Sequence, residues 1–136
     1  MTDSAKVEIV RRGFEALGRW DIEALLPDCH PEIEFVSLVE QIEGHAYRGH
    51  DGMRKLVTDM KEAWDIWEPV PEHFETAGDR LLAVGRTRLR GKGSGLEIEF
   101  SWGQVFLFRD GKLAWSRIYS DPGEARRRYE ALGADA

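Results

Sequence analysis

The sequence predicts an α+β fold in which helices lie on one side of a curved antiparallel or mixed sheet. In the first half of the chain, apolar residues recur three and four positions apart, which is typical of amphipathic helices. From Pro71 to Ser120 they recur at every second position instead, which is typical of strands. Turns rich in glycine divide this second segment into four strands. Helices set to one side of such a sheet make an α+β architecture.

Three helices are predicted in the first half of the chain. Asp3 or Ser4 caps the first, which ends at Gly18, and Asp21 caps a second, shorter helix that completes a helical hairpin. Asp51 leads into the third helix, whose apolar residues all fall on one face. These residues are Met53, Leu56, Val57, Met60, Ala63 and Trp64.

The strands and a short terminal helix complete the predicted domain. One strand is predicted from Glu32 to Leu38, and a short helix follows Asp121 and Pro122. The other strands are predicted over residues 71–77, 80–90, 96–108 and 112–120. Strands this long twist and coil, so the sheet curves around the helices and leaves a cavity. A chain of 136 residues supports one core, so we expect a single domain over residues 1–136.

Composition and charge exclude several classes of partner. The formal net charge of -6 argues against a nucleic-acid partner, because phosphate binding depends on clustered Lys and Arg. No apolar run approaches the length that spans a bilayer, so no membrane partner is expected. Cys29 is the only cysteine and cannot form an internal disulfide, and residues 1–6 lack the apolar core of a signal peptide. We therefore expect a cytoplasmic protein.

Several motifs carry a resemblance to a known family. They are the helix with Phe14 and the segments Gly18–Leu26, His30–Phe35, Tyr47–Gly52 and Arg109–Leu113. With them the sequence resembles the SnoaL-like branch of the NTF2-like superfamily, which includes ketosteroid isomerases, polyketide cyclases, limonene epoxide hydrolases and scytalone dehydratases. The resemblance implies a cone-shaped, cystatin-like α+β roll around one pocket. It also implies a homodimer paired through the outer face of the sheet, where Val105 and Leu107 are predicted to be exposed beside Glu97 and Glu99.

Gln104 is the first candidate for chemistry. It interrupts the apolar face of the strand over 96–108, and a buried amide must find hydrogen bonds there, either with a neighbouring side chain or with a ligand. The resemblance to ketosteroid isomerases places Gln104 near their protonated aspartic acid, which donates to an oxyanion. An amide can donate in the same way, but it cannot transfer a proton.

Glu40 is the second candidate. The resemblance places it near the general base of the isomerases, with Glu43 as the alternative if the loop is shifted by one register. A carboxylate at the mouth of an apolar pocket has a raised pKa, which suits proton abstraction next to a carbonyl. The alternative interpretation of Glu40 is a solvated loop residue.

Tyr119 is the third candidate, and it depends on how the last strand faces. If Leu113, Trp115, Arg117 and Tyr119 face the concave side, Arg117 and Tyr119 enter the pocket beside Gln104. Asp121 then either pairs with Arg117 or caps the terminal helix.

Aromatic residues are predicted to form much of the pocket wall, although tryptophans are more often core residues than ligand contacts. The spacing of Trp64 and Trp67 at the end of the third helix puts both on one side, near the cavity entrance. The predicted pocket residues are Phe14, Trp20, Phe35, Tyr47, Trp64, Trp67, Phe100, Trp102, Arg117 and Asp121.

The four histidines do not have the spacing of a zinc site, so no metal or other cofactor is expected. His45 and His50 are either acid–base groups at the pocket rim or surface-loop residues. The resemblance, together with these candidate residues, implies acid–base chemistry on a small hydrophobic molecule similar to a polyketide, a terpenoid or a steroid. The alternative is a non-catalytic module that binds a ligand or pairs with a partner.

Overall fold

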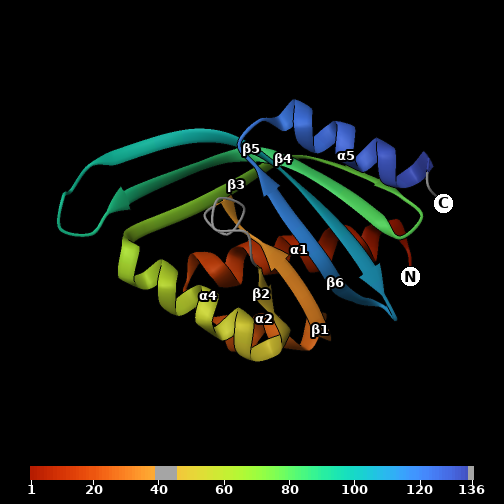
Figure 1. Cartoon of the computed structure of the whole chain (residues 1–136), viewed down its shortest axis with the longest axis horizontal. Helices are drawn as coiled ribbons and strands as arrows, with labels where there is room; N and C mark the ends of the chain where they lie inside the picture. The colour runs from red at the N-terminus through yellow and green to blue at the C-terminus, as the bar shows by residue number, and fades with distance from the viewer. Residues whose placement is uncertain (39–45, 135–136) are drawn as a thin grey trace.

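The computed structural model describes residues 1–38 and 46–134 of the chain. Its helices are α1 (Asp3–Gly18), α2 (Ile22–Leu25), the 3-10 helix η1 (Leu26–Asp28), α4 (Gly49–Ala63) and α5 (Pro122–Ala134). Its strands are β1 (Cys29–Val36), β2 (Tyr47–Arg48), β3 (Trp64–Ala77), β4 (Arg80–Gly91), β5 (Glu97–Arg109) and β6 (Lys112–Tyr119). The predicted α+β class is confirmed, with three helices from the first half of the chain, a curved sheet and a short C-terminal helix (Figure 1).

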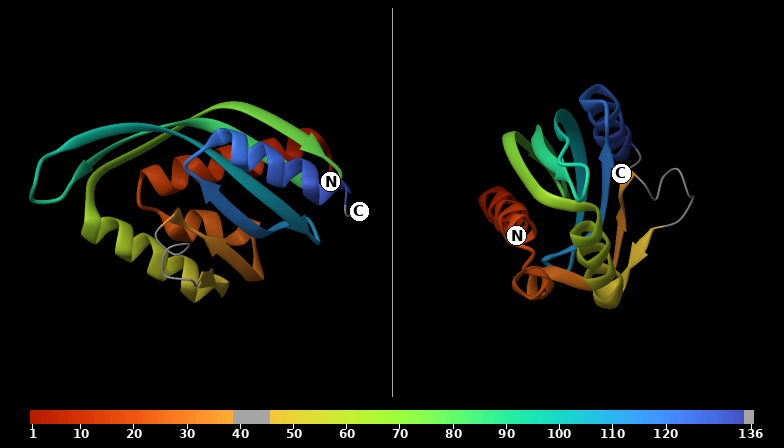
Figure 2. Two further views of the ribbon diagram at one scale, coloured as in Figure 1. Left: turned by 45° about the horizontal axis from the view of Figure 1, so that its top comes forward. Right: turned by 90° about the vertical axis from the view of Figure 1, so that its left-hand side faces the viewer.

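The strands form one mixed sheet in the order β2-β1-β6-β5-β4-β3. The β1 and β6 strands pair in parallel, and all other neighbours pair antiparallel. The sheet is curved and does not close, with α1 and α4 on its concave side and α5 on the opposite, outer side (Figure 2). Each face of the sheet therefore has its own apolar layer.

The first helical hairpin follows the prediction in outline and differs in its caps. Gly18 ends α1 and Asp21 caps α2, as predicted. The prediction of Asp3 or Ser4 as the first cap is wrong, because the Thr2 hydroxyl accepts the backbone N–H of Ala5 at 3.0 Å. The left-handed residue after α1 is Trp20, with φ 59°, although tryptophan seldom adopts this region.

The prediction for residues 64–71 is wrong, because β3 begins at Trp64 and runs through Pro69 and Pro71. Proline has no N–H to donate to the hydrogen-bond ladder of a sheet. The sequence therefore predicted that the strand begins only at the second of these prolines. However, β3 is an edge strand that pairs only with β4, so one side of its backbone needs no partner. The helix before it ends at Ala63, and Trp64 is already extended.

The first strand is also shifted from its predicted bounds. It starts at Cys29 instead of Glu32, because Cys29 already pairs with Leu113 of β6, and it ends at Val36. Tyr47 and Arg48 form β2, which is too short to show a sequence period and was not predicted. Beyond these shifts, the alternation of β1 holds.

A one-residue bulge in β6 reverses the side on which most of its residues lie. Phe108 pairs with Leu113 and Leu107 pairs with Trp115, so Ala114 is the extra residue. Leu113 faces the concave side, as predicted, but after the bulge Ser116 and Ile118 face that side instead of the odd-numbered residues. The predicted orientation of Trp115, Arg117 and Tyr119 is therefore wrong.

The α5 helix covers much of the outer face of β4, β5 and β6. Val105 is 0% exposed and packs with Leu82, Tyr119, Ala125 and Tyr129. The prediction that Val105 is exposed on a dimer surface is therefore wrong. Val105 belongs to a second apolar layer under α5.

Polar contacts hold α5 in place. The Asp121 side chain accepts the backbone N–H of Gly123 at 2.9 Å, which caps the helix. The Arg126 guanidinium donates to the Glu75 carboxylate of β3, and this pair lowers the pKa of Glu75 to about 2. The capping alternative for Asp121 is thus the one seen.

Gly103 allows α5 to approach β5 closely. A methyl group at this position would lie 3.1 Å from Pro122 Cα and still nearer to the Ala125 side chain. We predict that Gly103→Ala lowers the free energy of unfolding by about 1–3 kcal/mol, because the helix must move away from the sheet. Urea unfolding measures the effect. The matched control is Ser101→Ala on the exposed part of β5, and an equal loss in both variants would contradict the prediction.

Candidate functional site

A cavity of about 40 Å³ lies on the concave side of the sheet, between α1, α2, α4 and the strands. Its wall is almost entirely apolar. It is lined by Val10, Gly13, Phe14, Leu17, Leu25, Cys29, Ile33, Phe35, Met53, Trp67, Gln104, Phe106, Leu113, Ser116 and Ile118. Apart from the Cys29 thiol and the indole N–H of Trp67, its only polar side-chain groups are those of Gln104 and Ser116, among the residues that the structure describes.

Gln104 and Ser116 form a hydrogen-bonded pair in this wall. The Gln104 Nε2 donates to Ser116 Oγ at 2.6 Å, and the two side chains are 3% and 2% exposed. They lie diagonally across β5 and β6, since Gln104 pairs with Ile118 and Phe106 pairs with Ser116. This hydrogen bond satisfies the Nε2 donor group of the Gln104 amide inside the core. The Ser116 hydroxyl still has its own proton to donate.

Cys29 contributes an inert thiol to the wall. The side chain is 0% exposed, and burial raises the pKa of the thiol to about 12, with a smaller contribution from the charge of Asp28. At neutral pH the group is a protonated, mainly apolar side chain. It does not provide a nucleophile.

Three of the predicted pocket aromatics line the cavity, and they are Phe14, Phe35 and Trp67. Four of the others contact the same core without lining the cavity, and Trp64 does neither. Trp102 is buried in this core, and Trp20, Tyr47 and Phe100 pack against it.

Trp64 and Trp67 lie on one side, as predicted, but for a different reason. Their partners across the ladder are Gly91 and Leu89, which are two residues apart and face the same way. A bulge between Trp64 and Ile66 restores this alignment within β3. The helical spacing on which the prediction rested does not exist there.

Tyr119, Arg117 and Asp121 lie away from the cavity. The Tyr119 ring is buried on the outer side of the sheet under α5, and the Arg117 guanidinium lies 5.0 Å from its centroid. Asp121 is exposed at the start of α5. The predicted placement of Arg117 and Tyr119 beside Gln104 is therefore wrong, because the bulge at Ala114 turns their part of β6 to the other face. Asp121, which was predicted as a pocket residue, instead caps α5.

Several predicted acid–base candidates lie outside the cavity wall or outside the described residues. Glu40, Glu43 and His45 fall within residues 39–45, which the structure does not describe. His50 lies in α4, where its Nε2 donates to the Cys29 carbonyl oxygen at 3.0 Å and ties the helix to β1. Within the described part of the chain, no carboxylate or imidazole lines the cavity.

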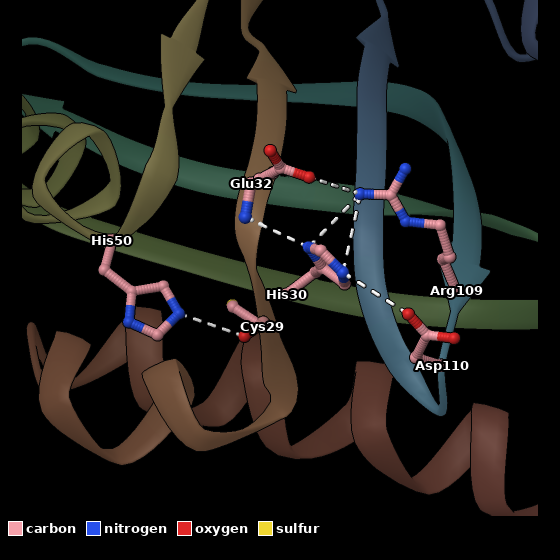
Figure 3. Close-up of polar contacts among 6 residues, drawn as sticks. All are labelled: Cys29, His30, Glu32, His50, Arg109 and Asp110. Atoms are coloured by element: carbon pink, nitrogen blue, oxygen red, sulfur yellow. Dashed lines mark hydrogen bonds and ion pairs between the residues drawn. The ribbon is translucent and has the colours of Figure 1, made fainter.

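His30 belongs to a polar cluster at the start of β1, as Figure 3 shows. Its Nδ1 accepts the backbone N–H of Glu32 at 3.0 Å, and its Nε2 lies 3.6 Å from the Asp110 carboxylate. Arg109 contacts the imidazole and also donates to the Glu32 carboxylate at 3.0 Å. These contacts fasten the β5–β6 turn to β1 (Figure 3). Among the described residues, no group of three His, Cys, Asp or Glu side chains could hold a metal ion.

Sequence reasoning missed Ser116, Ile118, Met53 and Cys29 as lining residues. Met53 was recognised as part of an amphipathic helix, and its burial follows from that pattern. Ser116 and Ile118 belong to the alternate set of β6, which the sequence offered as the second possibility. No local signal distinguishes the two sets, because the bulge that selects one of them lies at an ordinary alanine.

A family model for the SnoaL-like domain matches residues 10–116, which is most of the chain. The chain belongs to the SnoaL-like domain family. The predicted resemblance is thereby confirmed. The matched residues of this SnoaL-like protein include the second half of α1 and the strands through Ser116, and therefore nearly all of the cavity wall.

Solved structures agree with the family. An NTF2-like protein from Burkholderia xenovorans LB400 is 29% identical, with a TM-score of 0.75 over 95% of this chain and 98% of that one. An NTF2-like protein of unknown function from Burkholderia pseudomallei K96243 is 20% identical, with a TM-score of 0.77 over 95% and 98% of the two chains. TerC, co-crystallised with polyporic acid, is 20% identical, with a TM-score of 0.76 over 93% and 98%. The latter two similarities show the shared fold.

Among curated proteins, none matches this SnoaL-like chain. None of the helices in the described part of the chain is long and apolar enough to cross a membrane.

The buried position of Cys29 predicts very slow thiol chemistry. With a pKa of about 12 in place of 9.0, the thiolate fraction at pH 8 falls about 1,000-fold relative to an exposed cysteine. We predict that iodoacetamide labels the folded protein at least about 100-fold more slowly than the protein in urea, as followed by mass spectrometry. The variant Ser101→Cys, with its thiol on the exposed part of β5, is the matched control and should label rapidly when folded. Rapid labelling of folded Cys29 would contradict the buried site.

Proposed function

We propose that this SnoaL-like protein binds a small, largely apolar molecule in the cavity under α1. The observation that carries the proposal is the Gln104–Ser116 pair, which is the polar feature of an otherwise apolar wall. Ligand sites of this kind combine apolar contact area with a few placed polar groups. The pair provides such groups at the centre of the sheet.

The size of the cavity limits how a ligand is held. A volume of about 40 Å³ is much smaller than the roughly 300–1,000 Å³ of sites for drug-sized ligands. A molecule of polyketide or terpenoid size therefore needs the wall to move. The side chains of Phe14, Met53 and Trp67, which come from α1, α4 and the edge strand β3, are the large groups whose displacement would enlarge the cavity.

We propose acid–base chemistry as the activity of this site, with Glu40 as the general base. The support for this role is the family resemblance together with the position of Glu40, which follows β1 by four residues in the sequence. The Phe35 side chain of the same strand lines the cavity. Removal of a proton next to a ligand carbonyl needs a base and a hydrogen-bond donor for the developing oxyanion. Gln104 supplies the donor.

The second candidate function is ligand binding without turnover. The observation in its favour is that the described part of the cavity wall carries no carboxylate and no imidazole. A module of this kind would need only the apolar wall and the Gln104–Ser116 pair. The two functions differ in whether a bound ketone exchanges its acidic protons.

Binding is tested with two ligands that differ in one group, the ketone 1-tetralone and the hydrocarbon tetralin. Both should bind and quench the fluorescence of Trp67, which lines the cavity. We predict that Gln104→Leu weakens the binding of 1-tetralone by about 3- to 10-fold relative to the binding of tetralin, because one hydrogen bond contributes about 0.5–1.5 kcal/mol. Polyporic acid, the molecule crystallised with TerC, is a larger probe of the same site. Failure of all three compounds to bind would remove the proposal.

Catalysis is tested by the exchange of the C2 protons of 1-tetralone in D₂O, followed by NMR. We predict that the protein accelerates the exchange and that Glu40→Gln reduces the acceleration by about 100-fold or more, because positioned general bases contribute about 10²–10⁴-fold. The matched control is Glu97→Gln, because Glu97 is a carboxylate of β5 that does not line the cavity. Loss of exchange in Glu43→Gln instead would assign the base to Glu43. Binding of 1-tetralone with no accelerated exchange would favour the non-catalytic module.

A further inference from the structure

Trp102 has a polar atom that the fold does not satisfy. The side chain is 3% exposed, and its indole N–H has no hydrogen-bond partner among the described residues. Buried donors in folded proteins are almost always paired, because an unpaired donor loses its hydration without compensation. An exception of this kind requires an explanation.

Gly85 of the neighbouring strand leaves the space that the indole occupies. Trp102 pairs with Gly85 of β4, and a methyl group at Gly85 would lie 2.9 Å from Cζ2 of the indole and 2.8 Å from Pro71 Cα. Cζ2 and the nitrogen are attached to the same ring carbon. The glycine therefore makes room for the edge of the indole that carries the N–H group.

Trp102 lies next to the cavity without lining it. It shares the concave face of β5 with Gln104, two residues further along the strand. The Phe14 ring lines the cavity and also contacts Trp102, with ring centroids 5.2 Å apart. Phe14 thus belongs both to the cavity wall and to the surroundings of the indole.

We propose that Trp102 is a specificity-determining residue whose indole N–H donates to an acceptor oxygen of the bound ligand when the Phe14 side chain moves aside. The inference rests on the proposed function, because it uses the same cavity. It explains why a buried donor is held without a partner, since the ligand supplies the partner. It also implies that displacement of the Phe14 side chain enlarges the small cavity toward β4.

The chemistry of the indole defines the class of ligand. Its N–H donates and does not accept, and it does not transfer a proton. The matching group is a ketone, ester, quinone or ether oxygen on an apolar framework. A group that can only donate gains nothing from Trp102, and a hydrocarbon gains only apolar contact. The preferred ligands are therefore neutral, carbonyl-bearing apolar molecules.

The test combines the matched ligand pair with a matched pair of variants. Dissociation constants of 1-tetralone and tetralin are measured for the wild type, for Trp102→Phe and for Trp115→Phe. Trp115 is the control because it lies on the outer side of β6, away from the cavity. We expect Trp102→Phe to weaken the binding of 1-tetralone by about 3- to 10-fold more than the binding of tetralin. The ratio of the two dissociation constants cancels the effect of the smaller ring, which both ligands share. We expect Trp115→Phe to leave the ratio unchanged.

The wild-type protein provides a measurement that does not depend on either variant folding. In a ¹H–¹⁵N spectrum, the Trp102 indole signal should move downfield on addition of 1-tetralone and much less with tetralin. If both compounds bind, an unmoved indole signal and an unchanged affinity ratio overturn the role of Trp102 and leave the proposed function standing. If these two compounds and polyporic acid all fail to bind, both are overturned.

Discussion

The strands β5 and β6 serve two apolar layers at once, and the bulge at Ala114 decides which layer each side chain of β6 joins. Before the bulge Leu113 packs on the concave side, and after it Ser116 and Ile118 do so. The alternate residues are thereby directed under α5, where Tyr119 packs with Val105. A shift of one residue would exchange the two sets and bring an arginine into the cavity wall. This would be very costly, because an unpaired charge would then be buried. The register of this strand therefore determines both the site and the docking of α5.

The concave core combines a satisfied polar pair in the cavity wall with an unsatisfied donor beside it, and these have different energetic roles. Gln104 and Ser116 compensate each other, so the amide can remain in the core of the ligand-free protein. The indole N–H of Trp102 is not compensated by any described residue and makes the empty state less favourable than it would otherwise be. A ligand that satisfies this donor recovers that free energy on binding. In the role proposed for Trp102, the site thus favours carbonyl-bearing molecules without placing a charge in the core.

The sequence was sufficient to predict the fold class, because it depends on periodicity that extends over many residues. The apolar row from Phe100 to Phe108 in β5, with Gln104 in it, was predicted and is on the concave face. The sequence could not predict which β6 side chains face the concave side of the sheet. Both alternating sets of residues contain aromatic or aliphatic side chains, and the bulge has no local sequence signature. The start of β3 was missed because Pro69 and Pro71 end a helix or a central strand, but an edge strand accepts them. The unsatisfied indole of Trp102 emerges only from packing between β4, β5 and α1.

The two prolines of β3 also affect how this protein behaves beside copies of itself. The free edge of a long strand is a template on which another chain can add a strand, and such addition leads to fibrils. Pro69 and Pro71 both lack an N–H and lie two residues apart, so the missing donors are on one side of the strand. In an edge strand, proline is tolerated where this side faces solvent instead of the ladder. The opposite edge of the sheet is β2, with only two residues. Both edges are thus poor templates for the addition of another strand, which disfavours polymerisation of a curved sheet that does not close.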